Sequence, residues 1–517
     1  MAWRPQQHPG GGIRYLTRLH SVLTITIVAI ASTHSPAQTF PPGAKQNVIQ
    51  TENAKPGTPD WEITNPATHS EIEGYASLTS VNRGDLVELF VNTQNPSYSL
   101  EIYRMGWYGG AGARRVLGPV QLVGIQQPEP KPDRQTGLIE CLWGFPYELR
   151  IPDGSFVTPP NEDHDWVSGV HIARLTALPS RKQSYIIFVV RDDQRSSDIL
   201  FQSSVTTFEA YNNWGGKSLY RYNSTGRRAY KVSFNRPYDI GSGSGSAGHF
   251  LGALHFEYNM VRFLERQGYD VTYSTDIDTH NRGDLLLRHN AFLSVGHDEY
   301  WSWQMRENAQ KARDQGVNLG FFGANAVYWQ IRLEPSLVTA APDRTIVGYK
   351  QDALTLDPMY QNPATRYLTT TRWRDQPLNL PEAALVGTMF KFDPINSDMV
   401  VSKASSWVFG GTGLHNGSHL RGLLGYEIDS VDSSSPKGTQ ILAHSPYSAS
   451  GKTYYSDMTL YQANSRALVV STGTMQWNWG LDSYGAGQEL IDAATRTATQ
   501  TATANILKAF NAARTGK

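Results

Sequence analysis

A short apolar run, residues 291–296, leads directly into the turn His297-Asp298-Glu299, and a helical pattern follows from Trp301 to Gly316. A strand that ends in a turn before a helix places the side chains of that turn at the carboxyl edge of a sheet. Open α/β sheets tend to build their ligand sites at this edge. Ionisable groups beside an apolar strand are costly unless they are paired or used. The turn therefore predicts both an α/β fold and the position of a site.

The same alternation of strands and helices recurs through the C-terminal part of the chain. Strands are expected at residues 199–201, 270–273, 291–295, 318–322 and 467–470, and helices near 251–267, 301–315 and 487–513. This order predicts a mostly parallel sheet, which resembles that of the glutamine-amidotransferase-like fold. Residues from about 330 to 440 break the rhythm with Pro, Gly and short β runs, which indicates a β-rich insertion.

The N-terminal part of the chain is patterned differently. Leu86–Val91 and Tyr185–Val190 are apolar β runs, and residues 98–102 alternate between apolar and polar. Short strands between Gly, Pro and Asp turns predict an immunoglobulin-like β-sandwich. Because 517 residues exceed what one core usually supports, we expect separate domains at 38–197 and 198–517.

Composition and charge narrow the class of protein. Hydrophobic residues make up 39% of the chain and charged residues 18%, as in ordinary globular proteins. Lys plus Arg equals Asp plus Glu, 46 against 46, so no overall field would attract nucleic acid. We therefore expect no nucleic-acid partner.

The first 37 residues are typical of a secretory signal. Basic residues precede the apolar stretch Val22–Ala31, and Ser35-Pro36-Ala37 offers small residues at the cleavage positions. We expect cleavage after Ala37 and a secreted or periplasmic protein with no membrane span in the mature chain. The alternative is an uncleaved anchor, although the apolar stretch is short for a bilayer.

Cys141 is the only cysteine. Disulfides within the chain and zinc–thiolate sites are excluded. Since Cys141 lies outside the α/β region, the cysteine nucleophile of a glutamine amidotransferase is excluded too.

Within the turn, His297 and Glu299 are two residues apart and can point to the same side, while Asp298 faces the other way and could cap the following helix. Glu299 is a hard oxygen donor, and His297 can ligate a metal or donate a hydrogen bond. The alternative is a buried polar pair that only orders the turn.

Three other residues are candidates. Asn325 ends the next strand and either contacts substrate or caps the following segment. The loop that begins at Tyr211 should open at the same sheet edge. Tyr258 lies on the apolar stripe of its helix, so its spacing alone favours core packing.

Several motifs together resemble one family, the large subunit of N,N-dimethylformamidase. They are Ile102-Tyr-Arg-Met-Gly-Trp-Tyr-Gly-Gly110, Tyr211-Asn-Asn-Trp-Gly-Gly216, Glu257-Tyr258, Gly296-His-Asp-Glu-Tyr-Trp-Ser302 and Phe321-Phe-Gly-Ala-Asn325. The similarity runs from about residue 50 to the C-terminus, and the combination is more specific than any one motif.

The resemblance implies a mononuclear iron site with Tyr211, Tyr258 and Glu299 as ligands. It also implies that His297 and Asn325 lie beside the metal or contact the substrate. Phenolate and carboxylate are hard anionic donors, which suits Fe(III). Such an ion would polarise an amide carbonyl and lower the pKa of bound water.

Two residues are expected to handle protons. His297 would orient the substrate or pass a proton to the departing amine. Glu427 follows an apolar run and is a candidate general base, with a structural carboxylate as the alternative.

Two functions follow. The first is an exported, iron-dependent hydrolase of small amides or related C–N bonds, with a small amide-like substrate as its partner. The second is a non-catalytic or carbohydrate-binding exported protein with the same fold. The family's enzyme is cytoplasmic and has a small partner subunit, so a partner subunit and homo-oligomerisation stay open here. The resemblance concerns the fold and the metal site rather than dimethylformamide as the substrate.

Overall fold

The computed structural model describes residues 46–156, 163–240, 250–251, 255–485 and 487–512. The signal expected at residues 1–37 lies outside these described residues. Within them, no helix is both long enough and apolar enough to cross a membrane.

The N-terminal region consists of two sheets. One has the order β1 (Ile72–Ala76), β3 (Leu86–Thr93), β6 (Tyr147–Arg150), and the other β2 (Ser80–Asn82), β8 (Gln183–Arg191), β7 (Gly169–Leu178), β4 (Ser97–Met105), β5 (Ala113–Val123). All neighbours are antiparallel except β2 and β8. Val87, Leu89 and Val91 of β3 are buried at every second position with Leu100 and Ile102 of β4, because side chains alternate across a strand. The predicted antiparallel β region is confirmed.

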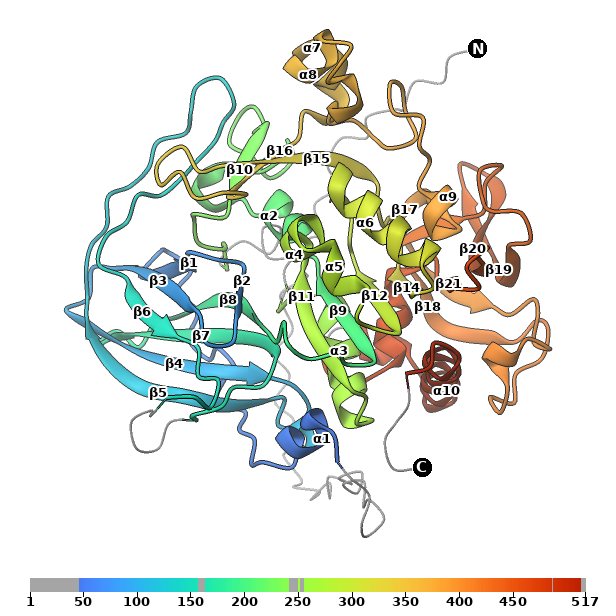
Figure 1. Cartoon of the computed structure of the whole chain (residues 1–517), viewed down its shortest axis with the longest axis horizontal. Helices are drawn as coiled ribbons and strands as arrows, with labels where there is room; N and C mark the ends of the chain where they lie inside the picture. The colour runs from blue at the N-terminus through green and yellow to red at the C-terminus, as the bar shows by residue number, and fades with distance from the viewer. Residues whose placement is uncertain (1–45, 157–162, 241–249, 252–254, 486, 513–517) are drawn as a thin grey trace, which may run out of the picture. The chain divides into compact units, whose positions relative to one another are not determined.

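A seven-stranded sheet follows (Figure 1). Its order is β11 (Val271–Thr275), β9 (Ile199–Ser203), β12 (Ala291–Gly296), β14 (Asn318–Gly323), β21 (Leu468–Ser471), β20 (Lys452–Gln462), β19 (Gln440–Ala449). The first five strands are parallel, and β20 and β19 extend the sheet antiparallel. The predicted, largely parallel sheet is confirmed, and the strands that lead to the candidate site are at its centre.

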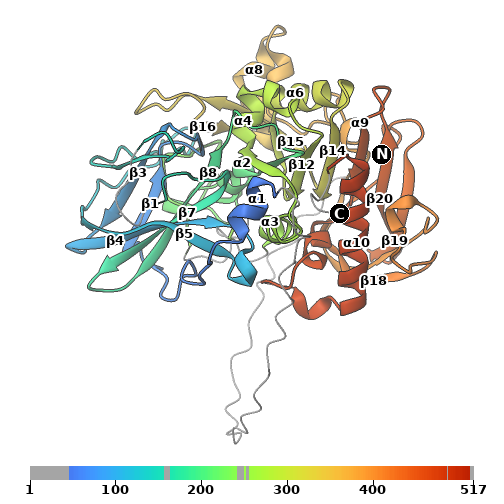
Figure 2. The same cartoon turned by 60° about the horizontal axis from the view of Figure 1, so that its bottom comes forward.

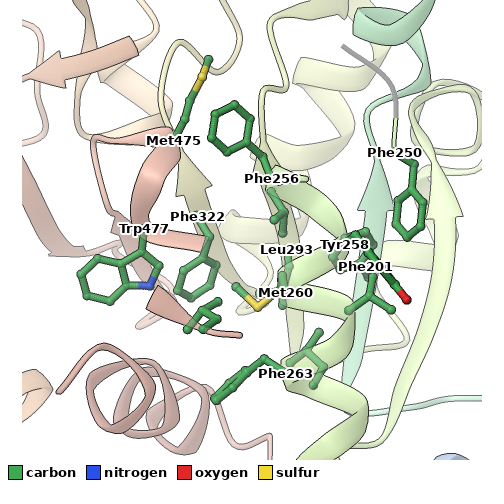
Figure 3. Packing of buried hydrophobic residues seen from close by; sticks show 14 of the residues in the cluster. Phe201, Phe250, Phe256, Tyr258, Met260, Phe263, Leu293, Phe322, Met475 and Trp477 are labelled. Atoms are coloured by element: carbon green, nitrogen blue, oxygen red, sulfur yellow. The ribbon is translucent and has the colours of Figure 1, made fainter. Parts of the chain in front are cut away.

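The three predicted helices are present with shifted ends: α3 (Phe256–Arg266), α6 (Trp303–Asp314) and α10 (Ala493–Ala509). Helix α6 begins late because Tyr300–Ser302 forms a short strand, β13, and Ser302 then caps the helix by accepting from the Met305 amide. Figure 3 shows Met260 and Phe263 of α3 packed with Phe322 and Trp477, so the apolar stripe of α3 faces the core.

The chain between β14 and β21 holds both strands and short helices. These are β15 (Trp329–Glu334), β16 (Thr345–Val347), α7 (Ala353–Leu356), α8 (Pro358–Gln361), α9 (Ala383–Val386), β17 (Met389–Val400) and β18 (His419–Ser430). Strands β17 and β18 pair into a long ribbon, and Figure 2 shows β18, β19 and β20 near α10. Strands β10 (Lys231–Ser233), β16, β15 and β13 form a further sheet. The remaining helices are α1 (Val48–Asn53), α2 (Val205–Tyr211), α4 (Asp276–Asn281) and α5 (Gly283–Leu286).

Among the described residues, the N-terminal sheets and the α/β part share one hydrophobic core. Arg104 of β4 and Glu265 of α3 form a fully buried ion pair of 2.7 Å across this junction. The N-terminal sheets therefore pack directly against the elements that carry the site.

Candidate metal centre

The turn after β12 has the geometry that its sequence predicts. Gly296 has a φ of 75°, and a Cβ there would lie 2.9 Å from Phe256 Cβ, so glycine is required. The turn is held by the Glu299 amide, which donates to Thr207 Oγ1 of α2. His297 Nε2 lies 3.3 Å from Glu299 Oε2, so the two side chains point to the same side.

Asp298 points the other way, as expected, but does not cap α6. Its carboxylate accepts hydrogen bonds from Trp301 Nε1 and Gln202 Nε2, each 2.7 Å long. Because Ser302 already caps the helix, the expected capping role of Asp298 is wrong. Its carboxylate orders the buried side of the turn.

The central feature of the site is a triangle of three oxygen atoms. Tyr211, the last residue of α2, donates to Glu299 Oε2 at 2.9 Å. The Tyr220 hydroxyl lies 2.8 Å from the Tyr211 hydroxyl and 2.9 Å from the same carboxylate oxygen. The two phenol rings stack at 4.3 Å, since the chain turns back after α2 and the Leu219 amide donates to Ala210 O. Two phenols and one carboxylate therefore converge on one point.

Tyr258 is not part of this triangle. Its side chain is fully buried, and its hydroxyl donates to the Gly112 carbonyl at 2.8 Å. Its ring packs against Trp61 and Phe250. The expected convergence of Tyr211, Tyr258 and Glu299 is corrected at this residue, because the apolar stripe of α3 directs Tyr258 into the core.

The second phenol is Tyr220, which the sequence analysis missed. The available signal was weak: a tyrosine nine positions after Tyr211, beyond the end of the motif Tyr211–Gly216. Only the fold of that loop distinguishes Tyr220 from the other tyrosines nearby.

The Tyr220 oxygen has more close neighbours than one hydroxyl proton can serve. It lies 2.6 Å from the Tyr300 hydroxyl and within 3.0 Å of both Glu299 oxygens, in addition to Tyr211. Buried Lys350 donates to Tyr300 at 2.9 Å and lies 3.3 Å from the centre of the Tyr220 ring. A hydroxyl offers one proton and two lone pairs, so this crowding of oxygens suits a cation better than a hydrogen-bond network alone.

The electrostatics of the triangle also suit a cation. Burial, followed by the charge of Glu299, raises the pKa of both Tyr211 and Tyr220 far above the ordinary value. Burial lowers the pKa of Lys350 to about 7, against the opposing pull of Glu299. The phenols would become phenolates only when a stronger positive charge faces them.

The donor set passes a simple test of fit. Neighbouring oxygens around a small hard cation with bonds of about 2.0–2.1 Å in octahedral geometry lie about 2.8–3.0 Å apart. The three sides of the triangle, 2.8, 2.9 and 2.9 Å, fall in this range. In the part of the chain that the structure describes, no group of three His, Cys, Asp or Glu side chains could hold a metal. A metal bound at Glu299 would therefore need donors of another kind, and the two phenol oxygens are the nearest ones.

His297 links the triangle to Glu427, which reaches the site from β18. His297 Nε2 lies 3.4 Å from Glu427 Oε2 as well as 3.3 Å from Glu299 Oε2. Burial alone would lower the pKa of His297, but Glu427 and Glu299 outweigh it and raise the pKa to about 10. Glu427 is buried, and its Oε2 forms no hydrogen bond within the described residues. An imidazolium thus lies between two carboxylates.

Asn325 is held by its backbone rather than by its side chain. It has a φ of 55°, and its amide donates to Asp429 Oδ1 at 2.8 Å. No helix follows it, since the next element is β15, so the capping alternative is wrong. Asn325 Oδ1 is buried and has no hydrogen-bond partner among the described residues. It is an acceptor that remains available.

The comparisons with known proteins concern the family of the chain. Residues 99–490 match the family described as "N,N-dimethylformamidase beta subunit-like, C-terminal". Over 233 residues the chain is 23% identical to the N,N-dimethylformamidase beta subunit of Paracoccus aminophilus, which covers 38% of this chain. The aligned part spans 29% of that subunit. Because the family match extends over more than half of the chain, this chain belongs to the N,N-dimethylformamidase beta subunit-like family.

Proposed function

We propose that Tyr211, Tyr220 and Glu299 hold one Fe(III) ion, with Tyr220 in the place first expected for Tyr258. The observation that carries this proposal is the oxygen triangle with sides of 2.8–2.9 Å. Three hard anionic donors would balance a trivalent charge. Glu299 lies in the motif with the strongest resemblance to the family.

We further propose that the protein hydrolyses small amides or related C–N bonds. Family membership and the name of the Paracoccus relative support this reaction class. A bound Fe(III) would polarise the amide carbonyl and acidify water. The remaining chemistry falls to side chains of this chain.

Glu427 and His297 are proposed to move protons. Glu427 Oε2, buried and without a hydrogen bond among the described residues, would accept a proton from the attacking water. His297 holds a proton near Glu427 and would deliver it from Nε2 to the departing amine. Asn325 Oδ1 is the proposed acceptor for a substrate N–H group.

Three further expectations from the sequence belong to the same proposal. They are an exported protein cleaved after Ala37, an immunoglobulin-like N-terminal domain, and a glutamine-amidotransferase-like sheet domain. Small amides are the proposed ligands, and nucleic acid is not.

The experiment combines metal analysis, a visible spectrum and an amide screen on the purified protein. We expect about one iron per chain, a tyrosinate-to-iron absorption band, and amine release from small amides. A colourless protein that lacks iron after expression in iron-replete medium and hydrolyses no amide would contradict the proposal.

A further inference from the structure

The outer side of the site carries acidic groups in excess of its cations. His297 is shared between Glu299 and Glu427, so one histidine faces two carboxylates. A third carboxyl group, Asp393 of β17, stands across the β17–β18 ribbon from Glu427.

The position of Asp393 results from an irregularity in the β17–β18 ribbon. Phe392 pairs with Ile428 and Ile395 with Tyr426, so Asp393 and Pro394 stand opposite the single residue Glu427. Such a bulge redirects side chains and is frequent beside active sites. It brings a second carboxylate to the one that His297 contacts.

Asp393 has no cation of its own. Across the described ranges, no Lys or Arg forms an ion pair with it, and neighbouring Lys391 instead lies 3.8 Å from Asp432. Asp393 is exposed, whereas Glu427 is buried and its Oε2 lies 3.4 Å from His297 Nε2. Asp393 therefore adds a negative charge that no Lys or Arg of the described residues pairs.

An aromatic face accompanies these carboxylates. Tyr222 is 67% exposed, and its ring lies 5.5 Å from that of Tyr220. This ring contact places Tyr222 at the edge of the candidate metal centre. An exposed aromatic face next to carboxylates is the usual surrounding of a bound ammonium group.

We propose that this site accepts small amides that carry an ammonium group, and that Asp393 and Tyr222 bind that group beside Glu427. The amide part of the inference rests on the proposed function, whereas the cation subsite does not. A neutral amide would leave the carboxylates uncompensated, and an anionic amide would be repelled.

The first test measures binding without turnover. Propylammonium, 1-propanol and propionate are similar in size and differ in charge, and ligand-observed NMR titration of the full-length protein reports millimolar affinities. We expect propylammonium to bind at least about fivefold more tightly than propanol, from one partly exposed ion pair and one cation–π contact. Asp393→Asn should remove this preference. The control is Asp398→Asn, because Asp398 is a carboxylate of the same strand that pairs with His419. This variant should keep the preference for propylammonium. Equal affinity for propylammonium and propanol would overturn the inference.

The second test uses a matched pair of amides, N-(2-aminoethyl)acetamide and N-propylacetamide. We expect a higher kcat/KM for the ammonium-bearing amide, and Asp393→Asn should reduce it by about fivefold with little change for the neutral one. Faster turnover of the neutral amide would overturn the inference while the proposed function stands. Hydrolysis of neither amide, together with selective binding of propylammonium, would retain the cation subsite and count against the amidase.

Discussion

The Tyr220 hydroxyl lies 2.9 Å from Glu299 Oε2, although 79 positions separate the two residues in the chain. Tyr220 returns to the end of α2 through a loop, and Glu299 arrives from the turn after β12. This contact identifies Tyr220 as the second phenol of the candidate metal centre.

Replacement of Tyr220 by Phe tests that assignment. Tyr220→Phe should lose most of the iron and the visible band, because one of three anionic donors is removed. The matched control is Tyr258→Phe, which removes a hydroxyl that donates to the Gly112 carbonyl. The control should keep iron and colour and lose about 1 kcal/mol of unfolding free energy. Elemental analysis, absorption spectra and urea unfolding measure these outcomes; the reverse pattern would restore Tyr258 as the ligand.

The two carboxylates that flank His297 should behave differently. Glu299→Gln should lose the metal, since a neutral amide is a poor ligand for a hard trivalent ion. Glu427→Gln should keep iron and colour but lower kcat by about 100-fold or more, as expected for a lost general base. Iron content measured beside kcat separates the roles. Loss of iron in Glu427→Gln would make Glu427 a ligand instead of a base.

His171, which has no role in the candidate metal centre, should make the stability of the fold sensitive to acid. Its ring stacks between Trp166 and Phe188, and burial, followed by the charge of Arg104, lowers its pKa to about 3. Between pH 6.5 and about 3, the unfolded chain binds a proton here that the folded chain does not. The contribution of neutral His171 to the free energy of unfolding is therefore fully present above pH 6.5. Between pH 6.5 and about 3 it falls by about 1.4 kcal/mol for each pH unit of acidification.

Urea unfolding between pH 7.5 and 4.5 measures this effect. His171→Phe should reduce the pH dependence of the unfolding free energy by the equivalent of about one proton. Because the hydrogen bond to Gly169 O is also lost, the variant should be about 1 kcal/mol less stable at pH 7.5. An unaltered pH dependence in His171→Phe would contradict the assignment.

The Arg104–Glu265 pair should dominate the junction between the N-terminal sheets and α3. Both side chains are fully buried, so Glu265→Gln leaves a buried guanidinium uncompensated and should cost about 3–5 kcal/mol. Asp314→Asn removes the exposed partner of Arg313 and should change stability by less than about 0.5 kcal/mol. Similar small losses in both variants would show that water or nearby groups compensate Arg104.

The regular elements of the sheet could be predicted because their signals are local. Apolar runs such as Ala291–Gly296 and Asn318–Gly323 bury both faces of a parallel strand, and periodic residues on α3 mark its core face. Spacing alone also favoured core packing for Tyr258, and the structure agrees. The ligand role came from the motif resemblance, which does not distinguish one nearby tyrosine from another.

The sequence by itself determined the α/β sheet, its antiparallel N-terminal neighbour, and the turn that presents His297 and Glu299 on one side, since these depend on periodicities of a few residues. Only the tertiary structure decided that Tyr220 completes the oxygen triangle and that Glu427 and Asp393 reach the same site. Those contacts join a loop, a turn and a bulged ribbon that are distant in the chain, and the path of a loop is set by the packing of the whole fold.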